Sequence, residues 1–516
     1  MMTASRIFPM NPNRLWLVGL VEIAVLLATF LIGLVAPAEA LPSFARQTGQ
    51  PCGTCHTDFP FLTPFGRRFK LLGYTVGGGM FRTTPFPTIP NARDAPAQAD
   101  KLRGYLKAVD SSTTEDKDYV PPISMMMIAG YTHTQAPLAP PTDPYKPNDN
   151  VILSPFSGFW GGAVTDHIGA FAQVTYNAPP AGGFPDPFGH TWTWDNTDVR
   201  YTREVNLGGM GAILGITANN NPSVQDVWNT TPAWAFPQAA STIGNSGPSA
   251  KTVIEGAFSA HVVGAGAYAY LNDLLYLEAT AYRTLDFAAQ NAVGVDPFGA
   301  PGLIDAAAPY WRAALEPHWG NHSLMVGTFG MMTSIHNWID PTFAIGSTDT
   351  FAQTDKFTDV GFDSQYQYQG ENYWITLRGS YIREFQRLDS TFGMGGSSNP
   401  TDVLNSLRLL ASLAYGSDNR IVLTGQYFNA WGTPDALLNP NVVPDSNGWI
   451  VEVAYIPSAP ARHRVGPGRM PASASTIHST TSSTEPALVP VITTRCFSTF
   501  GWPCRAVSGC AGRVLP

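Results

Sequence analysis

Charged residues are scarce in this chain. Lys, Arg, Asp and Glu together make up 13% of its 516 residues, and its net charge at pH 7 is −8. The acidic balance and the absence of a basic cluster argue against binding to nucleic acid. Beyond residue 40, no segment approaches the roughly 18 consecutive apolar residues of a membrane-spanning helix. The chain after residue 40 is therefore not predicted to cross a membrane with helices.

Residues 1–40 have the features of a secretory signal peptide. Arg6 and Arg14 precede a nearly unbroken apolar run at 15–35, and an A-x-A cleavage site follows at 38–40. The apolar run is also long enough to be a membrane anchor. Small residues and a proline follow it, however, where an anchor would usually carry basic residues. An exported chain with few charges and no further helical span is predicted to be a soluble β protein or an outer-membrane β-barrel.

Cysteine is almost absent from the first 495 residues, which hold only Cys52 and Cys55. His56 follows them, so residues 52–56 form the pattern C-x-x-C-H, which is typical of c-type haem attachment. The two thiols add to the haem vinyl groups, and the histidine supplies the proximal nitrogen to the iron. A thioredoxin-like redox pair and half of a zinc site are the alternatives. The first lacks a βαβ context here, and the second lacks further ligands nearby.

After residue 121, short segments with period-two alternation of apolar and polar residues predict β-strands. In residues 405–415, Leu409 and Leu413 fall on one face, and Arg408 and Ser412 fall on the other. Residues 170–177 and 373–381 alternate in the same way. Such faces suit a wall with lipid on one side and water on the other.

The predicted connections alternate in length. Tight turns are predicted at 165–167, 206–209, 272–273, 320–321, 370–372 and 416–419. Long polar loops lie between them, at about 136–149, 179–191, 220–251, 288–307, 336–354, 387–402 and 431–446. Short periplasmic turns alternating with long external loops are typical of outer-membrane barrels. A soluble β-sandwich or propeller is the alternative.

The fold class predicted is all-β: an outer-membrane β-barrel at 121–457 behind a small N-terminal segment at 41–82. About 14 strands are in frame, the last at 448–455. Residues 83–120 are rich in Pro, Thr and Asp without a sustained period, and are interpreted as a linker or a pore-lining loop.

The tail at 458–516 does not continue the strand pattern. It contains the run PASASTIHSTTSST at 471–484 and three further cysteines, Cys496, Cys504 and Cys510. One interpretation is a disordered, low-complexity secreted tail. The other is a shift of reading frame between about 456 and 471. In the shifted frame, residues 472–484 can read RIGLNYTFYDFVD and residues 490–504 can read AGDNNALFLYVWLAL, which are two plausible strands. The intended barrel would then have about 16 strands, an even number.

The residues that follow the cysteine pair predict a short capped helix. Thr63 is the expected N-cap, Pro64 the first helical residue and Gly73 the terminator. A segment this small builds little core of its own. It is therefore expected to lean on the barrel or to plug its lumen. A set of apolar side chains in it would shield one haem edge: Phe59, Phe61, Phe65, Phe69 and Leu72.

The distal ligand of the haem iron has several candidates. Met80, Met126 within the run 125–127, and His133 are each placed so that a short loop or the first barrel strand brings them near the iron. Packing in the barrel wall is the alternative for each. A methionine would raise the reduction potential relative to a second histidine.

Charged residues supply two further hypotheses. Arg46, Arg67, Arg68 and Lys70 flank the motif, where they either pair with the haem propionates or form a solvated face or docking patch. Acidic residues of the predicted loops either concentrate a cation near the pore mouth or merely solvate the loops and shape turns. These residues are Asp143, Asp149, Asp186, Asp195, Asp198 and Asp226.

Residues 44–75, FARQTGQPCGTCHTDFPFLTPFGRRFKLLGYT, resemble the haem segment of the fused outer-membrane monohaem cytochrome–porins, the family that includes bacterial iron oxidases. The stretches FWGGAVTDHIGAFAQVTY at 159–176, TWDNTDVRY at 193–201 and NNNPSVQDVWNTTPAWAFP at 219–237 also resemble this family. The similarity runs from about residue 41 to 457. The resemblance implies one covalent haem c on Cys52 and Cys55, with His56 as the proximal ligand.

The resemblance also implies a function of the Fe(II):cytochrome c oxidoreductase type. Electrons from extracellular Fe(II) or another donor would pass to a periplasmic c-type cytochrome or another soluble carrier. The expected location is the outer membrane of a Gram-negative bacterium, with the haem segment in the barrel lumen or on the periplasmic side. A haem-bearing porin for transport or sensing, and electron export to an external acceptor, are the alternatives.

Overall fold

The computed structural model describes residues 43–44, 52–75, 123–133, 149–165, 167–176, 191–222, 224–231, 235–238, 247–337, 354–416, 419–439, 441–456, 473–483 and 485–490. At 131–133, 149–155 and 473–490 the description covers the backbone alone. The predicted signal peptide at 1–40, the linker or loop at 83–120 and the tail beyond residue 490 lie outside these residues.

The N-terminal segment is small and has mixed secondary structure. It contains the helices α3 (Cys52–Cys55) and α4 (Pro64–Leu71) and the strands β1 (His56–Asp58) and β2 (Phe61–Leu62). β1 and β2 pair with each other in antiparallel orientation and are separate from the large sheet. Among the described residues, no helix is long and apolar enough to cross a membrane.

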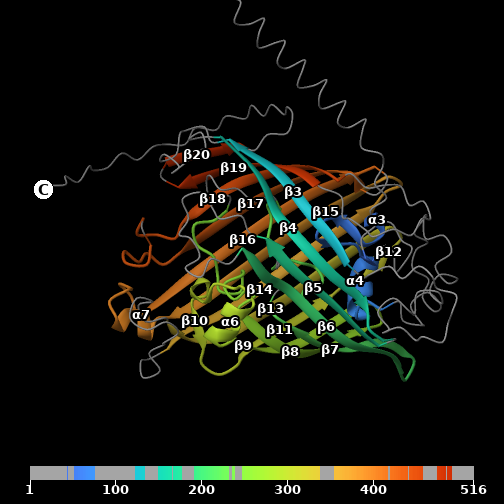
Figure 1. Ribbon diagram of the computed structural model, residues 1–516, viewed down its shortest axis with the longest axis horizontal. Helices are drawn as coiled ribbons and strands as arrows, with labels where there is room; N and C mark the ends of the chain where they lie inside the picture. The colour runs from blue at the N-terminus through green and yellow to red at the C-terminus, as the bar shows by residue number, and fades with distance from the viewer. Residues whose placement is uncertain are drawn as a thin grey trace, which may run out of the picture.

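The remaining described strands form one 18-stranded sheet that closes into a barrel (Figure 1). β9 pairs with β11, and the last strands meet β3. The strands are β3 (Ile123–His133), β4 (Asp149–Ala163), β5 (Ile168–Tyr176), β6 (Trp192–Leu207), β7 (Met210–Asn219), β8 (Val262–Leu271), β9 (Leu275–Thr284), β10 (Gly302–Ile304), β11 (Ala308–Leu315), β12 (His318–Trp319), β13 (His322–Asn337), β14 (Asp355–Gln369), β15 (Tyr373–Arg387), β16 (Thr401–Tyr415), β17 (Ile421–Gly432), β18 (Ser446–Tyr455), β19 (Ser473–Ser483) and β20 (Glu485–Pro490).

The strand count agrees with the sequence prediction. Without the short β10 and β12, the described barrel has sixteen strands, of which fourteen lie between β3 and β18. The fourteenth ends at Tyr455, as predicted. The prediction of an all-β barrel, and of about 14 strands before residue 457, is confirmed.

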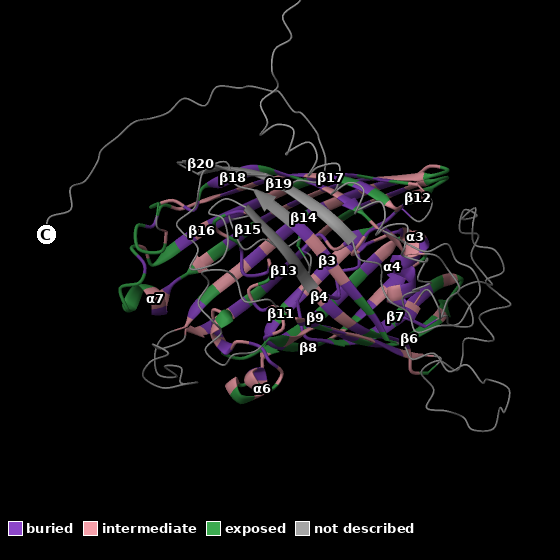
Figure 2. Ribbon diagram, turned by 45° about the horizontal axis from the view of Figure 1, so that its top comes forward, coloured by how far each residue is buried: buried purple, intermediate pink, exposed green. Residues whose placement is uncertain are grey.

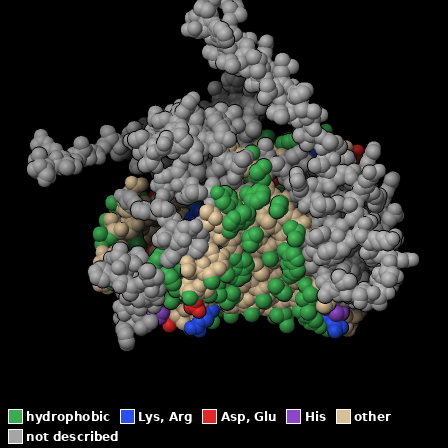
Figure 3. Space-filling model, viewed as in Figure 1, with side chains coloured by type: hydrophobic (Ala, Val, Ile, Leu, Met, Phe, Trp, Pro, Cys, Tyr) green, Lys and Arg blue, Asp and Glu red, His purple; other side chains and the backbone are tan. Residues whose placement is uncertain are grey.

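The two faces of each strand differ as the alternation predicted. On β15, Leu377 is 47% exposed, while its neighbours Thr376 and Arg378 are buried. On β16, Leu409 and Leu413 are exposed on the same outer face. Figure 2 shows buried and exposed residues alternating along the strands, and Figure 3 shows apolar side chains gathered over the outer wall. An apolar outside and a polar inside are what a barrel in a bilayer requires.

The connections alternate between tight and long, again as predicted. The tight ones are 164–167, 208–209, 272–274, 316–321, 370–372 and 416–420, and they lie at the end of the barrel where α3 and α4 are found (Figure 1). The described long connections at 285–301 and 388–400 lie at the opposite end. They carry α6 (Phe287–Ala292), the 3-10 helix η2 (Pro297–Gly299) and α7 (Asp389–Gly393).

The predicted loop at 220–251 does not behave as an external loop. The described parts of residues 220–261, here called the inner loop, are largely buried and contact inward-facing side chains of distant strands. Thr230 bonds to Asp363 of β14, and the backbone nitrogen of Val253 donates to Glu384 of β15 at 2.5 Å. Glu255 accepts from Arg408 of β16 at 2.7 Å. The inner loop therefore crosses the barrel interior, because its polar groups find their partners there.

The last two strands, β19 and β20, do not follow the regular up-and-down arrangement of the other strands. β18 ends at Tyr455 and β19 begins at Ser473, at the end of the barrel where the other connections are tight, whereas β19 ends at Ser483 and β20 begins at Glu485. β20 has 6 residues and pairs with β19 only between 478 and 483. At 473–476, β19 instead pairs with β3, and this pairing is parallel. An even barrel of up-and-down strands closes with an antiparallel pair.

Candidate functional site

The C-x-x-C-H motif forms a single helical turn. α3 extends from Cys52 to Cys55, and His56 begins β1 directly after it. Residues three apart lie on the same face of a helix. The spacing therefore places both thiols on one side of the turn, and both cysteines are half-buried.

α4 packs directly on this turn. The backbone nitrogen of Thr63 donates to the carbonyl of Cys55 at 2.9 Å, and the Thr63 hydroxyl donates to the carbonyl of Thr54 at 2.5 Å. A Cβ atom at Gly66 would overlap the carbonyl oxygen of Cys55, so the close approach requires glycine. The predicted helix is confirmed: Thr63 is the N-cap, with its side chain accepting from the nitrogen of Gly66 at 3.1 Å, and Pro64 is the first residue. Gly73 follows with φ +68°.

His56 is held as a neutral imidazole. Burial lowers its pKa to about 4, an effect that the carbonyl groups of Pro60 and Phe61 partly offset. The ring lies 4.7 Å from that of Phe59, between centroids, and the backbone carbonyl accepts from Asn419 at 2.7 Å. Its Nδ1 atom is buried without a hydrogen-bond partner. A neutral imidazole keeps a lone pair with which it can bind a metal ion.

The thiol of Cys55 is unlike that of a redox-active pair. Burial, together with the neighbouring Cys52, raises the pKa of Cys55 to about 12. Reactive pairs of the thioredoxin type depend on a lowered thiol pKa. The environment of the turn therefore does not favour the redox-pair alternative.

In the haem-free protein, alkylation of Cys55 by iodoacetamide is expected to be slow at pH 8 and to accelerate as the pH approaches about 12, because the thiolate is the reacting species. Mass spectrometry of the modified peptide measures the rate. The urea-unfolded chain is the control, since its thiols titrate near pH 8.5 and react readily at pH 8. Fast modification of Cys55 at neutral pH in the folded protein would restore the redox-pair interpretation.

These residues fit a covalent c-type haem. Two thiols stand on one helical turn, and a neutral histidine with an unpartnered nitrogen follows immediately. Cys52 and Cys55 would form the thioether bonds, and His56 would bind the iron.

Of the candidate distal ligands, Met126 lies inside the barrel. It is 5% exposed and belongs to a buried cluster with Phe61, against which Phe59 also packs. Because Phe59 contacts His56, Met126 lies in the same part of the interior as the motif. Met125 is 47% exposed on the outer face. Met80 and the side chain of His133 lie outside the described residues.

The basic residues of α4 bind the barrel wall and the inner loop. Arg67 pairs with Glu316, Arg68 pairs with Asp273 and Glu204, and the Lys70 ammonium donates to the carbonyl of Val224. Arg67 and Arg68 are thus buried and ion-paired, so the solvated face or docking patch is wrong for these two residues. Pairing of the basic residues with the haem propionates stays a prediction. Arg46 lies outside the described residues.

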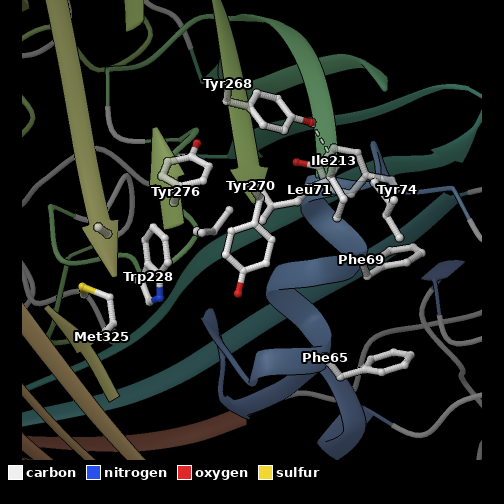
Figure 4. Close-up of a cluster of buried hydrophobic side chains, with 13 residues drawn as sticks. Phe65, Phe69, Leu71, Tyr74, Ile213, Trp228, Tyr268, Tyr270, Tyr276 and Met325 are labelled. Atoms are coloured by element: carbon white, nitrogen blue, oxygen red, sulfur yellow. Dashed lines mark hydrogen bonds between the residues drawn. The ribbon is translucent and has the colours of Figure 1, made fainter. Parts of the chain in front are cut away.

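Apolar contacts complete the attachment of the segment. Phe65, Phe69 and Leu72 pack into one buried cluster with aromatic residues of the wall and of the inner loop. Figure 4 shows Phe65 and Phe69 on α4 and Trp228 of the inner loop. The hydroxyl of Tyr268 donates to the carbonyl of Leu71 at 2.6 Å, and that of Tyr74 donates to Asp198 at 2.6 Å. The expectation that so small a segment packs against the barrel is confirmed.

The structure describes the side chains of three aspartates that were predicted to attract a cation near the pore mouth. Asp195 and Asp198 belong to β6 rather than to a loop, and Asp198 forms a buried ion pair with Arg200 at 2.7 Å. Asp226 of the inner loop lies 3.7 Å from Arg312 and accepts from the backbone nitrogen of Trp228 at 2.9 Å. Asp198 and Asp226 are therefore bound to arginines in the interior, and the cation hypothesis is wrong for these two residues. For Asp195, which is half-buried and accepts from the Thr175 hydroxyl at 2.7 Å, it stays a prediction. Asp143, Asp186 and the side chain of Asp149 lie outside the described residues.

Sequence reasoning missed the inner loop as part of the site. Val227 and Trp228 are almost fully buried, and Trp228 packs on Tyr276 with 5.2 Å between ring centroids. Large apolar residues within an otherwise polar loop were the available signal. They indicate a loop that folds inward.

The chain is a closed β-barrel with an apolar outer face. No protein-family model matches it, and no curated protein matches it. OmpT of Vibrio cholerae is similar over 70% of this chain and 85% of its own, at 8% identity and a TM-score of 0.36. The outer-membrane channel DcaP of Acinetobacter baumannii is similar over 62% of this chain and 93% of its own, at 10% identity and a TM-score of 0.30. OccAB1 of the same species is similar over 74% of this chain and 99% of its own, at 9% identity and a TM-score of 0.33.

Proposed function

We propose that this protein is an outer-membrane electron conduit of the cytochrome–porin type. Cys52, Cys55 and His56 would hold a single haem c, and the protein would use it to carry electrons from an extracellular donor, Fe(II), to a periplasmic c-type cytochrome. The observation that carries the proposal is a C-x-x-C-H turn held by buried contacts against the inner wall of a barrel with an apolar outer face.

The dimensions of the membrane support this proposal. The hydrocarbon layer is about 30 Å thick, which one haem cannot span. A lone redox centre that serves both sides must therefore lie within or under a pore that admits the donor. The tight-turn end of the barrel, where α4 is attached, corresponds to the periplasmic end in outer-membrane barrels.

The residues of the chain have distinct parts in such a site. Cys52 and Cys55 would bind the haem through thioether bonds. The side chain of Asn419 donates a hydrogen bond to the backbone carbonyl of His56 and so holds this residue in place. Phe59 and Phe61, with Met126, keep water from the side of the motif that faces the wall. When bound, the haem supplies a carrier of one electron whose potential depends on its ligands and surroundings.

The test is the absorbance of reduced haem in outer membranes that carry the full-length protein with its reading frame restored, before and after anaerobic addition of Fe(II). Rapid reduction is expected, and the spectrum should be lost entirely in the Cys52→Ser/Cys55→Ser variant. Reoxidation on addition of an oxidised soluble c-type cytochrome tests the second half of the path.

Dithionite provides the control for this measurement, since it reduces any haem that is present. A haem that dithionite reduces and Fe(II) does not would remove iron as the donor. The absence of any covalent haem in the unsubstituted protein would overturn the proposal as a whole.

A further inference from the structure

Arg378 is a buried cation whose partners are all neutral. It lies on the inner face of β15 and is 9% exposed. Its Nε and Nη2 atoms donate to the side-chain oxygen of Gln365 at 3.0 and 2.7 Å, and its Nη1 donates to the carbonyl of Asn229 at 2.9 Å. Its guanidinium carbon lies 4.2 Å from the ring centroid of Phe61. Burial of a charge without a counter-charge is unfavourable.

The carboxylates around Arg378 are held by other groups. Asp226 and Asp363 both flank Arg312, at 3.7 and 2.5 Å. Asp58 lies near the Thr424 hydroxyl, at 3.5 Å. The other buried arginines among the described residues, Arg67, Arg68, Arg200 and Arg312, each form an ion pair, whereas Arg378 forms none with a described carboxylate.

A cavity of about 40 Å³ lies beside Arg378. Lys251 and Arg408 also line it, and its single carboxylate, Glu255, is bound by Arg408 at 2.7 Å. A water molecule needs roughly 10–15 Å³ of such volume. The cavity therefore has room for a small anionic group, and its lining has an excess of positive charge.

The cavity adjoins the segment that carries the C-x-x-C-H motif. Phe61 lines it, and Phe61 pairs with Asp58 in the small β1–β2 sheet that begins at His56. The basic residues nearer to the motif are already paired with the wall, as described for α4. In this part of the described interior, the buried arginine without a carboxylate partner is therefore Arg378 on the barrel wall, and it is the residue that could bind an anion.

We propose that Arg378, with Lys251 beside it, forms a carboxylate-binding site inside the barrel, and that the propionates of the haem occupy it. The identity of the occupant rests on the proposed function, whereas the site itself does not. A free small carboxylate is the other source of the same chemistry. A guanidinium binds a carboxylate through two parallel hydrogen bonds, which gives such a site geometric selectivity.

The first experiment uses the haem-free full-length protein and acetate as the probe, measured by calorimetric titration in detergent. Acetate is expected to bind, and its Kd is expected to rise about tenfold or more in Arg378→Gln, since a charge-assisted hydrogen-bonded pair is lost. Arg378→Lys keeps the charge and is expected to retain part of the binding. Arg383→Gln is the matched control, because Arg383 is exposed on the opposite face of the same strand.

The second experiment repeats the titration on haem-loaded protein and measures the midpoint potential. If the propionates fill the site, acetate no longer binds, and Arg378→Gln lowers the potential, because removal of a nearby cation stabilises the more positive ferric state. Arg383→Gln should leave the potential unchanged. Heat-modifiability confirms that each variant is folded before the titration.

The outcomes separate the site from its occupant. Acetate binding that persists in haem-loaded protein and is lost in Arg378→Gln supports the carboxylate site but overturns the propionate assignment. Absence of acetate binding in the haem-free protein, or unchanged binding in folded Arg378→Gln, overturns the site. If no haem attaches at all, the first experiment still decides, so that failure of the proposed function and failure of the site are distinguished.

Discussion

Replacement of Arg67 by methionine is expected to lower the free energy of unfolding by about 3–5 kcal/mol, because Glu316 is left as a buried charge without its partner. The two side chains form an ion pair in which they are 2% and 3% exposed. Arg67 also donates to the carbonyl of Leu62 at 2.7 Å and to Gln367 at 2.8 Å. Urea unfolding in detergent measures the loss, and limited proteolysis should show residues 52–75 cleaved earlier than in the unsubstituted protein.

The double variant Arg67→Met/Glu316→Met is the matched control. Replacement of both members of a buried pair by apolar residues of similar size is often neutral, so most of the stability should return. A single variant as stable as the unsubstituted protein would show that this ion pair does not hold the segment. Equal losses in the single and double variants would attribute the effect to packing rather than to the charge of Glu316.

A full-length chain whose tail is translated in the shifted frame is expected to assemble into heat-modifiable barrels, whereas the unshifted chain is expected to assemble poorly. Unpaired strand edges in lipid leave backbone groups without partners, at several kcal/mol for each group. The measurement is the mobility shift between heated and unheated samples of outer membranes in gel electrophoresis. The same fraction of heat-modifiable protein from both chains would contradict the frame hypothesis.

The strand pattern gives the physical reason for this expectation. A sixteenth strand of full length would lie between β19 and β3 and run antiparallel to both, whereas β20 has 6 residues and leaves β19 in parallel contact with β3. The shifted frame supplies a longer apolar and aromatic strand at 490–504.

Local signals in the sequence predicted the features that depend on neighbouring residues. The capped helix α4 follows from Thr63, Pro64 and Gly73, because capping involves groups within one turn. The two faces of β15 follow from the alternation of Leu377 with Thr376 and Arg378, because side chains of a strand point alternately to its two sides.

Predictions that depended on the choice of a distant partner were wrong. The solvated face suggested for Arg67 is not formed, because Arg67 is buried against Glu316, which lies 249 positions away in the sequence. Asp198 was assigned to a cation-attracting loop, yet it pairs with Arg200 inside the wall. Charge alone does not specify which of several opposite charges a residue will meet, because that depends on how the strands close around it.

The sequence by itself determined the barrel, its fourteen regular strands up to Tyr455, its alternation of turns and loops, and the C-x-x-C-H turn. All of these arise from short-range periodicity, capping and motif spacing. Only the tertiary structure decided that α4 is bound to the wall through Arg67 and Arg68, that the inner loop crosses the interior, and that Arg378 has no carboxylate partner among the described residues. These features arise when strands far apart in the sequence bring their inner faces together, and no local pattern contains that information.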